Sequence, residues 1–210
     1  MSLEEESLIF DIDGTLWDSR ALVAEGYNIQ LRREGLDHLG VTAADLKPLF
    51  GKTMTEIADA LFGSLSEETR YDLMARCMAT EQEHLRMDPC RIGYPDVATT
   101  LETLAQRHRL FIVSNSEQGY PELTMEKLGI THLIQGHLCF GDTGTDKGTT
   151  ILRLMERCRI TSAVYIGDTQ GDMEATYKAG LPFVWASYGF GTPERYDCKV
   201  DRFAQLAEIF

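Results

Sequence analysis

The feature that most constrains the fold is an alternation of short apolar runs with helical patterns in the second half of the chain. Residues 110–113, 163–166 and 183–186 are apolar runs of the length expected for buried strands, and 133–140 holds a weaker strand pattern. The intervening segments have helical patterns, over residues 94–107, 121–128, 146–158 and 172–178. Strands that alternate with helices predict an α/β fold, a mostly parallel sheet covered by helices on both faces.

A further apolar run lies near the N-terminus. Residues 8–10 lead into Asp-Ile-Asp-Gly-Thr at residues 11–15. The two carboxylates are separated by one residue where the chain leaves the sheet, so both can converge on one ion. Gly14 frees the backbone to turn, and Thr15 adds a hydroxyl. The simpler interpretation, a strand followed by an ordinary Asp-Gly turn, is the alternative when this segment is considered alone.

The segment between these two regions has only helical patterns. Candidate helices follow Ser19, Thr42, Thr53 and Ser66, and no convincing strand is found before residue 90. The segment is too long to be a loop. We therefore predict an inserted α-helical domain over residues 18–91. Residues 4–17 and 92–210 would form the α/β core, and residues 17–19 and 90–93 would be the two linkers.

Composition limits the partners of the chain. A formal net charge of −13 over 210 residues, without a basic stripe, argues against binding to nucleic acid. The five cysteines are widely spaced and form no CxxC or Cys/His pattern, which indicates reduced thiols in a cytoplasmic protein. We find neither an apolar run of membrane-spanning length nor a signal peptide, and we expect no membrane partner. A monomer or a homodimer is expected.

Polar side chains follow three of the predicted strands. They are Asp11 and Asp13, Ser114 and Asn115, and Asp168. Because the carboxyl ends of parallel strands meet at one edge of the sheet, these groups should converge there. Lys147 begins a predicted helix, where both its charge and the helix N-terminus favour an anion. Carboxylates with a lysine and hydroxyl donors suit Mg²⁺ and a phosphoryl group, and without the cation the carboxylates would repel phosphate.

Four motifs occur in a characteristic order along the chain. Asp-Ile-Asp-Gly-Thr (11–15), Val-Ser-Asn (113–115), Lys147 and Gly-Asp-Thr-x-x-Asp (167–172) resemble the motifs of the haloacid dehalogenase superfamily. The resemblance covers essentially the whole chain, because the helical insertion is similar to the cap of the phosphoglycolate phosphatase-like branch. It implies a Rossmann-like core with a helical cap. It also implies a Mg²⁺-dependent phosphatase that acts on a small phosphorylated metabolite.

The resemblance also implies roles for the catalytic residues. Asp11 would be the nucleophile that forms an aspartyl-phosphate, because an ionised carboxylate needs no base. Asp13 would protonate the leaving oxygen and later deprotonate water, which requires a pKa above the usual value of about 3.9. Lys147 would neutralise the nucleophile and the transferring group. Ser114, with the adjacent backbone at Asn115, would hold phosphate oxygens.

The remaining implied roles concern the metal and the substrate. Mg²⁺ would be bound by Asp11, Asp168 and the backbone carbonyl of Asp13, and Asp172 would support Lys147 or a metal-bound water. Thr15 would add a phosphate contact. In the helical domain, Lys52 would meet an anionic group on the leaving portion of the substrate, such as a carboxylate. A solvated lysine near a helix start is the alternative for Lys52.

Three alternatives to a phosphatase remain at this stage. A β-phosphoglucomutase-like mutase places a cap histidine twelve residues after the nucleophile, where this chain has Val23, and residues 116–118 lack the Ser-Lys of many mutases. Dehalogenases and phosphonatases typically lack the second aspartate, which is present here as Asp13. A regulatory protein would keep the phosphate site but have little turnover. Nothing in the motifs supports lost chemistry, because the catalytic residues are all present, namely Asp11, Asp13, Lys147 and Asp168. Two departures from phosphoglycolate phosphatases are noted: Ser-Asn-Ser at 114–116 in place of Thr-Asn-Lys, and Gly148 in place of proline.

Overall fold

The computed structural model describes residues 7–89 and 92–210. Its contacts divide the chain into two compact units. The α/β unit comprises Met1–Asp18 and Arg91–Phe210, and the helical unit comprises Ser19–Cys90. The start of the predicted core at residues 4–6, and the linker residues Cys90 and Arg91, lie outside the described residues.

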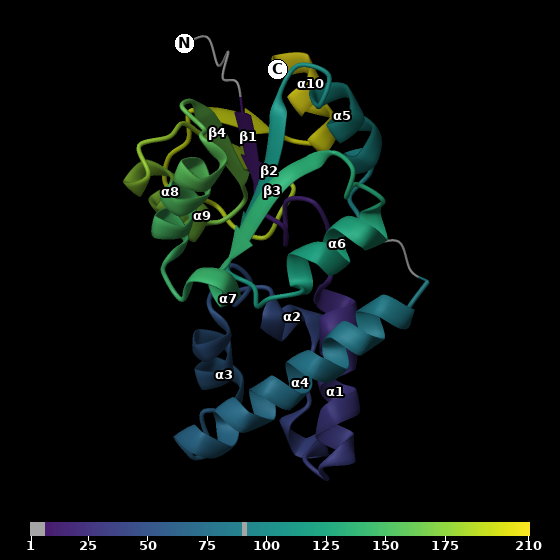
Figure 1. Ribbon diagram of the computed structural model, residues 1–210. Helices are drawn as coiled ribbons and strands as arrows, with labels where there is room; N and C mark the ends of the chain where they lie inside the picture. The colour runs from purple at the N-terminus through teal and green to yellow at the C-terminus, as the bar shows by residue number, and fades with distance from the viewer. Residues whose placement is uncertain (1–6, 90–91) are drawn as a thin grey trace. The chain divides into compact units, whose positions relative to one another are not determined.

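The α/β unit is built on a six-stranded sheet in which every neighbouring pair of strands is parallel, in the order β3-β2-β1-β4-β5-β6 (Figure 1). The strands are β1 (Ser7–Phe10), β2 (Arg109–Ser114), β3 (Ile134–Cys139), β4 (Ala163–Gly167), β5 (Phe183–Ala186) and β6 (Cys198–Val200). The predicted parallel α/β fold is confirmed. The edge strand β6 was not predicted, because three residues are too few to show a periodic pattern.

Helices lie on both faces of this sheet. They are α5 (Val97–Leu104), α6 (Tyr120–Leu128), α7 (Phe140–Thr143), α8 (Lys147–Cys158), α9 (Gln170–Lys178), the 3₁₀ turn η2 (Phe203–Gln205) and α10 (Leu206–Ile209). Figure 1 shows α8 and α9 on one side and α5 with α10 on the other. The helix predicted from residue 94 begins only at Val97, because Asp96 has a left-handed backbone conformation with φ of 63°.

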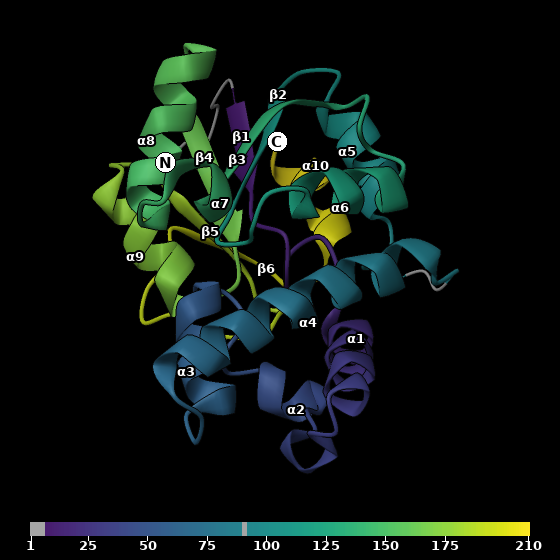
Figure 2. The same ribbon diagram turned by 60° about the horizontal axis from the view of Figure 1, so that its bottom comes forward.

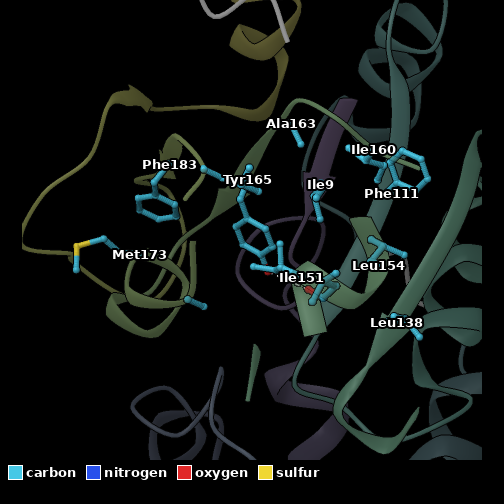
Figure 3. Close-up of a cluster of buried hydrophobic side chains, with 13 residues drawn as sticks. Ile9, Phe111, Leu138, Ile151, Leu154, Ile160, Ala163, Tyr165, Met173 and Phe183 are labelled. Atoms are coloured by element: carbon cyan, nitrogen blue, oxygen red, sulfur yellow. Dashed lines mark hydrogen bonds between the residues drawn. The ribbon is translucent and has the colours of Figure 1, made fainter. Parts of the chain in front are cut away.

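One hydrophobic cluster of the α/β unit lies between the sheet and helices α8 and α9 (Figure 3). Alternate strand residues point to opposite faces, so Ile9, Phe111 and Tyr165 point toward this cluster, where Ile151 of α8 joins them. These side chains are completely buried. Burial of a large apolar side chain contributes about 1.5–3 kcal/mol, so the cluster holds the strand ends at fixed positions.

The helical unit contains α1 (Arg20–Arg33), the 3₁₀ turn η1 (Asp37–Leu39), α2 (Ala43–Leu46), α3 (Met54–Phe62) and α4 (Glu67–Met87). Figure 2 shows α1 and α4 side by side, and the two helices are in contact. Gly26 of α1 permits this approach, since a Cβ there would lie 2.6 Å from Cα of Glu81. The predicted caps Thr42, Thr53 and Ser66 each accept a backbone hydrogen bond at a helix start. Among residues 19–89 there is no strand, as predicted.

None of the helices in the described part of the chain combines the length and the apolar character that a bilayer crossing requires.

Candidate active site

The loop after β1 wraps around the first carboxylates. The N–H of Asp11 donates to the carbonyl of Ile166 at 2.9 Å, which continues the pairing of β1 with β4. The carbonyl of Ile12 then accepts the N–H groups of the next turn, so the chain coils directly above the sheet edge. Gly14 has φ of 87°, and a Cβ there would lie 2.2 Å from Oδ2 of Asp168. Glycine at this position therefore allows the loop to approach the end of β4.

Lys147 joins two carboxylates that are distant in the sequence. Its Nζ lies 2.6 Å from Oδ1 of Asp11 and 2.6 Å from Oδ1 of Asp172. All three side chains are buried, with at most 4% exposed. Lys147 is the first residue of α8, and the side chain of Asp146 caps this helix. The predicted meeting of Asp11, Lys147 and Asp172 is therefore observed as a buried ion-pair chain.

The Gly-Asp-Thr-x-x-Asp motif forms the N-terminus of α9. Thr169 is the N-cap, and its hydroxyl accepts the N–H of Asp172 at 3.1 Å. Oδ2 of Asp172 in turn accepts the N–H and the hydroxyl of Thr169, at 3.0 and 2.6 Å. This capping box fixes Oδ2, so Oδ1 of Asp172 faces Lys147. The helix thus begins at Gln170, two residues before the predicted start.

Burial and mutual repulsion shift the pKa values of these groups. Burial, with the charge of Asp172, raises the pKa of Asp11 to about 7 although Lys147 opposes the shift. Burial and the charges of Asp172 and Asp11 raise the pKa of Asp168 well above its usual range. Burial would lower the pKa of Lys147, but Asp11 and Asp172 together raise it well above its ordinary value. Lys147 therefore remains charged, and it lowers the pKa of Asp172 against the effect of burial.

A divalent cation fits this cluster. Asp11, Asp168 and Asp172 offer carboxylate oxygens that lie within 4.8 Å of one another. Asp168 is completely buried, and its Oδ1 has no hydrogen-bond partner in the described part of the chain. An unpartnered buried carboxylate oxygen is costly, and three carboxylates exceed the single charge of Lys147. A hard cation with oxygen ligands would compensate both, so the donor set fits a metal such as Mg²⁺.

The predicted phosphate-binding residues surround the same edge of the sheet. Ser114 ends β2 and is buried, and its hydroxyl accepts the N–H of Ser116 at 3.1 Å. Asn115 follows it and is half-buried. The hydroxyl of Thr15 is buried and has no hydrogen-bond partner within residues 7–89 and 92–210. Their roles remain predictions.

Lys52 lies in the helical unit, outside this cluster. It is exposed and immediately precedes Thr53, the N-cap of α3. Contact between Lys52 and a substrate remains a prediction.

Sequence reasoning missed the contribution of the loop after β5. The N–H of Phe190 donates to Oδ2 of Asp168 at 2.6 Å. Gly189 packs so closely that a Cβ would lie 2.4 Å from Cβ of Asp168, and Tyr188 donates its hydroxyl to the carbonyl of Thr15 at 2.9 Å. The glycines at 189 and 191, directly after a predicted strand, were the available signal.

Sequence reasoning also missed two aromatic residues that donate hydrogen bonds to Asp13. The indole N–H of Trp17 and the hydroxyl of Tyr120 both donate to Oδ1 of Asp13, each at 2.9 Å. Tyr120 lies outside the four motifs and 107 residues from Asp13, so no motif indicated that the two would meet.

A parallel sheet with this buried acidic cluster at its carboxyl edge is the architecture of a hydrolase family. The profile of the haloacid dehalogenase-like hydrolases matches residues 8–186. The chain therefore belongs to this family, and the resemblance inferred from the four motifs is confirmed.

Relatives of known name agree with this assignment. A phosphoglycolate phosphatase from Xanthomonas campestris pv. campestris (strain 8004) is 28% identical over 195 residues, covering 88% of this chain and 84% of that protein. A phosphoglycolate phosphatase from Aquifex aeolicus (strain VF5) is 28% identical over 192 residues, covering 87% and 85%. The alignments span most of both chains, which supports the phosphoglycolate phosphatase-like branch.

Solved structures share the fold. A predicted phosphoglycolate phosphatase from Haemophilus somnus 129pt superposes with a TM-score of 0.86 at 23% identity, covering 98% of each chain. A haloacid dehalogenase-like family protein from Streptococcus pneumoniae superposes with a TM-score of 0.82 at 17% identity, also covering 98% of each chain. These likenesses establish the fold.

Proposed function

We propose that this protein is a Mg²⁺-dependent phosphatase that hydrolyses a small phosphorylated metabolite through an aspartyl-phosphate on Asp11. The observation that supports this most directly is the buried chain of Asp11, Lys147 and Asp172 beside the unpartnered oxygen of Asp168. Such a site offers a nucleophile, a fixed positive charge and a place for a cation within a few ångströms.

The nucleophile in this proposal is Oδ2 of Asp11. Lys147 holds Oδ1 of the same carboxylate at 2.6 Å, which orients the other oxygen for attack on phosphorus. We assign Mg²⁺ to Asp11, Asp168 and the carbonyl of Asp13, where it would neutralise charge between the carboxylates and the phosphoryl group. Asp172 supports Lys147, because both of its oxygens already accept hydrogen bonds.

Asp13 is the proton donor and acceptor in this proposal. As the bond between phosphorus and the leaving oxygen breaks, Asp13 gives its proton to that oxygen and becomes a carboxylate. A water then attacks the phosphoryl group on Asp11 and loses its proton to Asp13. Inorganic phosphate leaves, and both aspartates return to their starting states.

We further propose residues 18–91 as the cap domain that selects the substrate. The relatives named phosphoglycolate phosphatase support a small carboxylated phosphate as the first candidate. Lys52 would then pair with the carboxylate, so Lys52→Ala should raise KM for phosphoglycolate and leave KM for an uncharged alkyl phosphate unchanged.

Free thiols are consistent with action in the cytoplasm. The four cysteines in the described part of the chain are unpaired, namely Cys77, Cys139, Cys158 and Cys198. Reduced thiols are typical of that compartment.

The test is phosphate release from a panel of phosphorylated metabolites, with Mg²⁺ and with a chelator. The panel includes phosphoglycolate, sugar phosphates, nucleoside monophosphates and pyridoxal phosphate. We expect Mg²⁺-dependent release that Asp11→Asn reduces by more than about a thousandfold, because the nucleophile is lost. Asp201→Asn is the matched control, since this exposed aspartate pairs with Lys199.

Two other outcomes would contradict the proposal. Conversion of β-glucose 1-phosphate to its 6-phosphate without phosphate release would show a mutase. Binding of phosphate analogues without turnover of any compound would show a regulatory protein.

A further inference from the structure

Asp13 is held by two aromatic donors from different parts of the chain. Its Oδ1 accepts the indole N–H of Trp17 and the hydroxyl of Tyr120, each at 2.9 Å. Trp17 is completely buried and Tyr120 is 7% exposed. Their rings meet edge to face, with centroids 5.6 Å apart and planes at 73°. The two residues together hold one oxygen of Asp13 in a fixed position.

Separate elements place the two donors. The N–H groups of Leu16 and Trp17 donate to the carbonyl of Ile12, so the chain makes a helical turn that brings the indole back to Asp13. The backbone of Trp17 also bridges to Gly93, which fixes the end of this turn. Tyr120 is the first residue of α6, and Pro121 follows it at a position that suits the start of a helix. Trp17 is therefore held by backbone contacts on both sides, and Tyr120 is held by a helix.

The two oxygens of Asp13 are therefore chemically different. An indole N–H only donates, so the oxygen that faces Trp17 must accept. A carbonyl-type oxygen accepts two donors well, whereas a protonated oxygen would have to turn its own hydrogen away from Trp17 and toward the Tyr120 hydroxyl. The neutral form of Asp13 therefore carries its proton on Oδ2.

We infer that Trp17 and Tyr120 are positioning residues, which hold Oδ1 of Asp13 so that Oδ2 carries the proton given to the leaving oxygen. The inference rests on the proposed function. The proton moves from Oδ2 to the leaving oxygen as the phosphorus–oxygen bond breaks, and the water that later attacks the phosphoryl group returns a proton to the same oxygen. Loss of either donor would let the carboxyl group rotate and would misplace the proton.

The experiment measures kcat/KM for two classes of phosphate monoester. The leaving group of an alkyl phosphate is an alkoxide, which must be protonated as it departs. The leaving group of p-nitrophenyl phosphate is a stabilised phenolate, which needs little protonation. The value of kcat/KM reports the step in which the leaving group departs, whatever the rate of hydrolysis of the phosphoryl-aspartate. Misplacement of the proton donor therefore affects the alkyl ester selectively.

The variant is Tyr120→Phe, which removes one hydroxyl and keeps the ring. We expect kcat/KM for the alkyl phosphate to fall about tenfold more than kcat/KM for p-nitrophenyl phosphate, since one of the two hydrogen bonds that hold Oδ1 of Asp13 is lost. Tyr177→Phe is the matched control, because it removes a hydroxyl that donates to Asp197 at 3.1 Å, away from the cluster. That control should leave the ratio of the two values unchanged.

Trp17→Phe is the second variant, and the same selective loss is expected for it. An equal loss for both esters in Tyr120→Phe and Trp17→Phe would overturn the inference and leave the phosphatase proposal standing. Absence of wild-type turnover with any phosphate ester would overturn both together.

Discussion

At the residue scale, Lys147 compensates charges that the protein has removed from water. It is the cation paired with Asp11 and Asp172, and all three side chains are almost completely buried. A buried ion pair contributes little net stability compared with apolar packing, but the loss of one partner leaves an uncompensated charge. The stability of the fold therefore depends on this lysine independently of any catalytic role.

Lys147→Met should lower the free energy of unfolding by about 3–5 kcal/mol. The matched control is Lys178→Met, because Lys178 pairs with Asp146 at 2.8 Å but both side chains are 55% exposed. Loss of such a surface pair costs at most about 1 kcal/mol. Urea unfolding in the presence of a chelator measures both variants. Equal decreases in the free energy of unfolding for the two variants would show that burial does not increase the cost of losing the lysine.

The raised pKa of Asp11 predicts a pH-dependent response to Mg²⁺. A folded-state pKa of about 7 lies above the unfolded value of 3.8, so the folded protein binds this proton more tightly than the unfolded chain. In the presence of a chelator, the stabilisation that comes from this proton on Asp11 is fully present below about pH 4. It is lost as the pH rises through about 7. A cation competes with the proton, so Mg²⁺ should raise the melting temperature more at alkaline than at acidic pH.

Thermal melts with and without Mg²⁺ on each side of pH 7 make this measurement. Asp168→Asn is the comparison, because it removes a proposed ligand and should abolish most of the Mg²⁺ effect. A Mg²⁺ effect of the same size at every pH would count against the carboxylate cluster as the binding site.

At the element scale, the N-terminus of α9 couples helix stability to the active site. Thr169 caps the helix and at the same time holds Oδ2 of Asp172, whose Oδ1 binds Lys147. One local motif thus determines the orientation of a carboxylate that lies 25 residues from its lysine partner. A change in the cap should therefore alter both stability and turnover.

Thr169→Ala should lower the free energy of unfolding by about 1–2 kcal/mol and also reduce kcat. Thr42→Ala is the control, because Thr42 forms the same capping box with Asp45 at the start of α2 in the helical unit. It should affect stability alone. Urea unfolding and steady-state kinetics distinguish the two, and an unchanged kcat in Thr169→Ala would show that the cap does not position Asp172.

At the scale of the whole molecule, the α/β unit contains every residue of the buried cluster. The chain leaves this unit after Asp18 and re-enters it near Ile92, and the N–H of Asp18 donates to the carbonyl of Ile92 at 2.9 Å. The two ends of the helical insertion are therefore adjacent within the α/β unit.

A chain in which residues 19–90 are replaced by a short Gly-Ser linker should fold and retain the stabilisation by Mg²⁺. The closeness of Asp18 and Ile92 means that the linker closes without strain. Circular dichroism melts with and without Mg²⁺ check this, with the full chain as reference. Loss of cooperative unfolding would show that the sheet depends on the helical unit.

Much of the fold could be predicted because it follows from local patterns. The strands β1, β2, β4 and β5 were found from apolar runs, and the caps of α2, α3 and α4 from Thr or Ser before a helical pattern. The short elements β6, α7 and α10 were missed, since three or four residues do not establish a period. The left-handed conformation of Asp96 also left no local signal and displaced the start of α5.

The sequence by itself determined the order of the elements, the parallel sheet and the convergence of four motifs at one edge. The order of the elements follows from periodicity, which involves residues close together in the chain. The convergence follows from the common direction of parallel strands, whose carboxyl ends meet at one edge. Only the tertiary structure decided which atoms meet. Lys147 and Asp11 are 136 residues apart, and Tyr120 and Asp13 are 107 apart. Pairings at that distance, and the pKa shifts that burial produces, depend on how the packed core brings the strand ends together, and no local pattern encodes that.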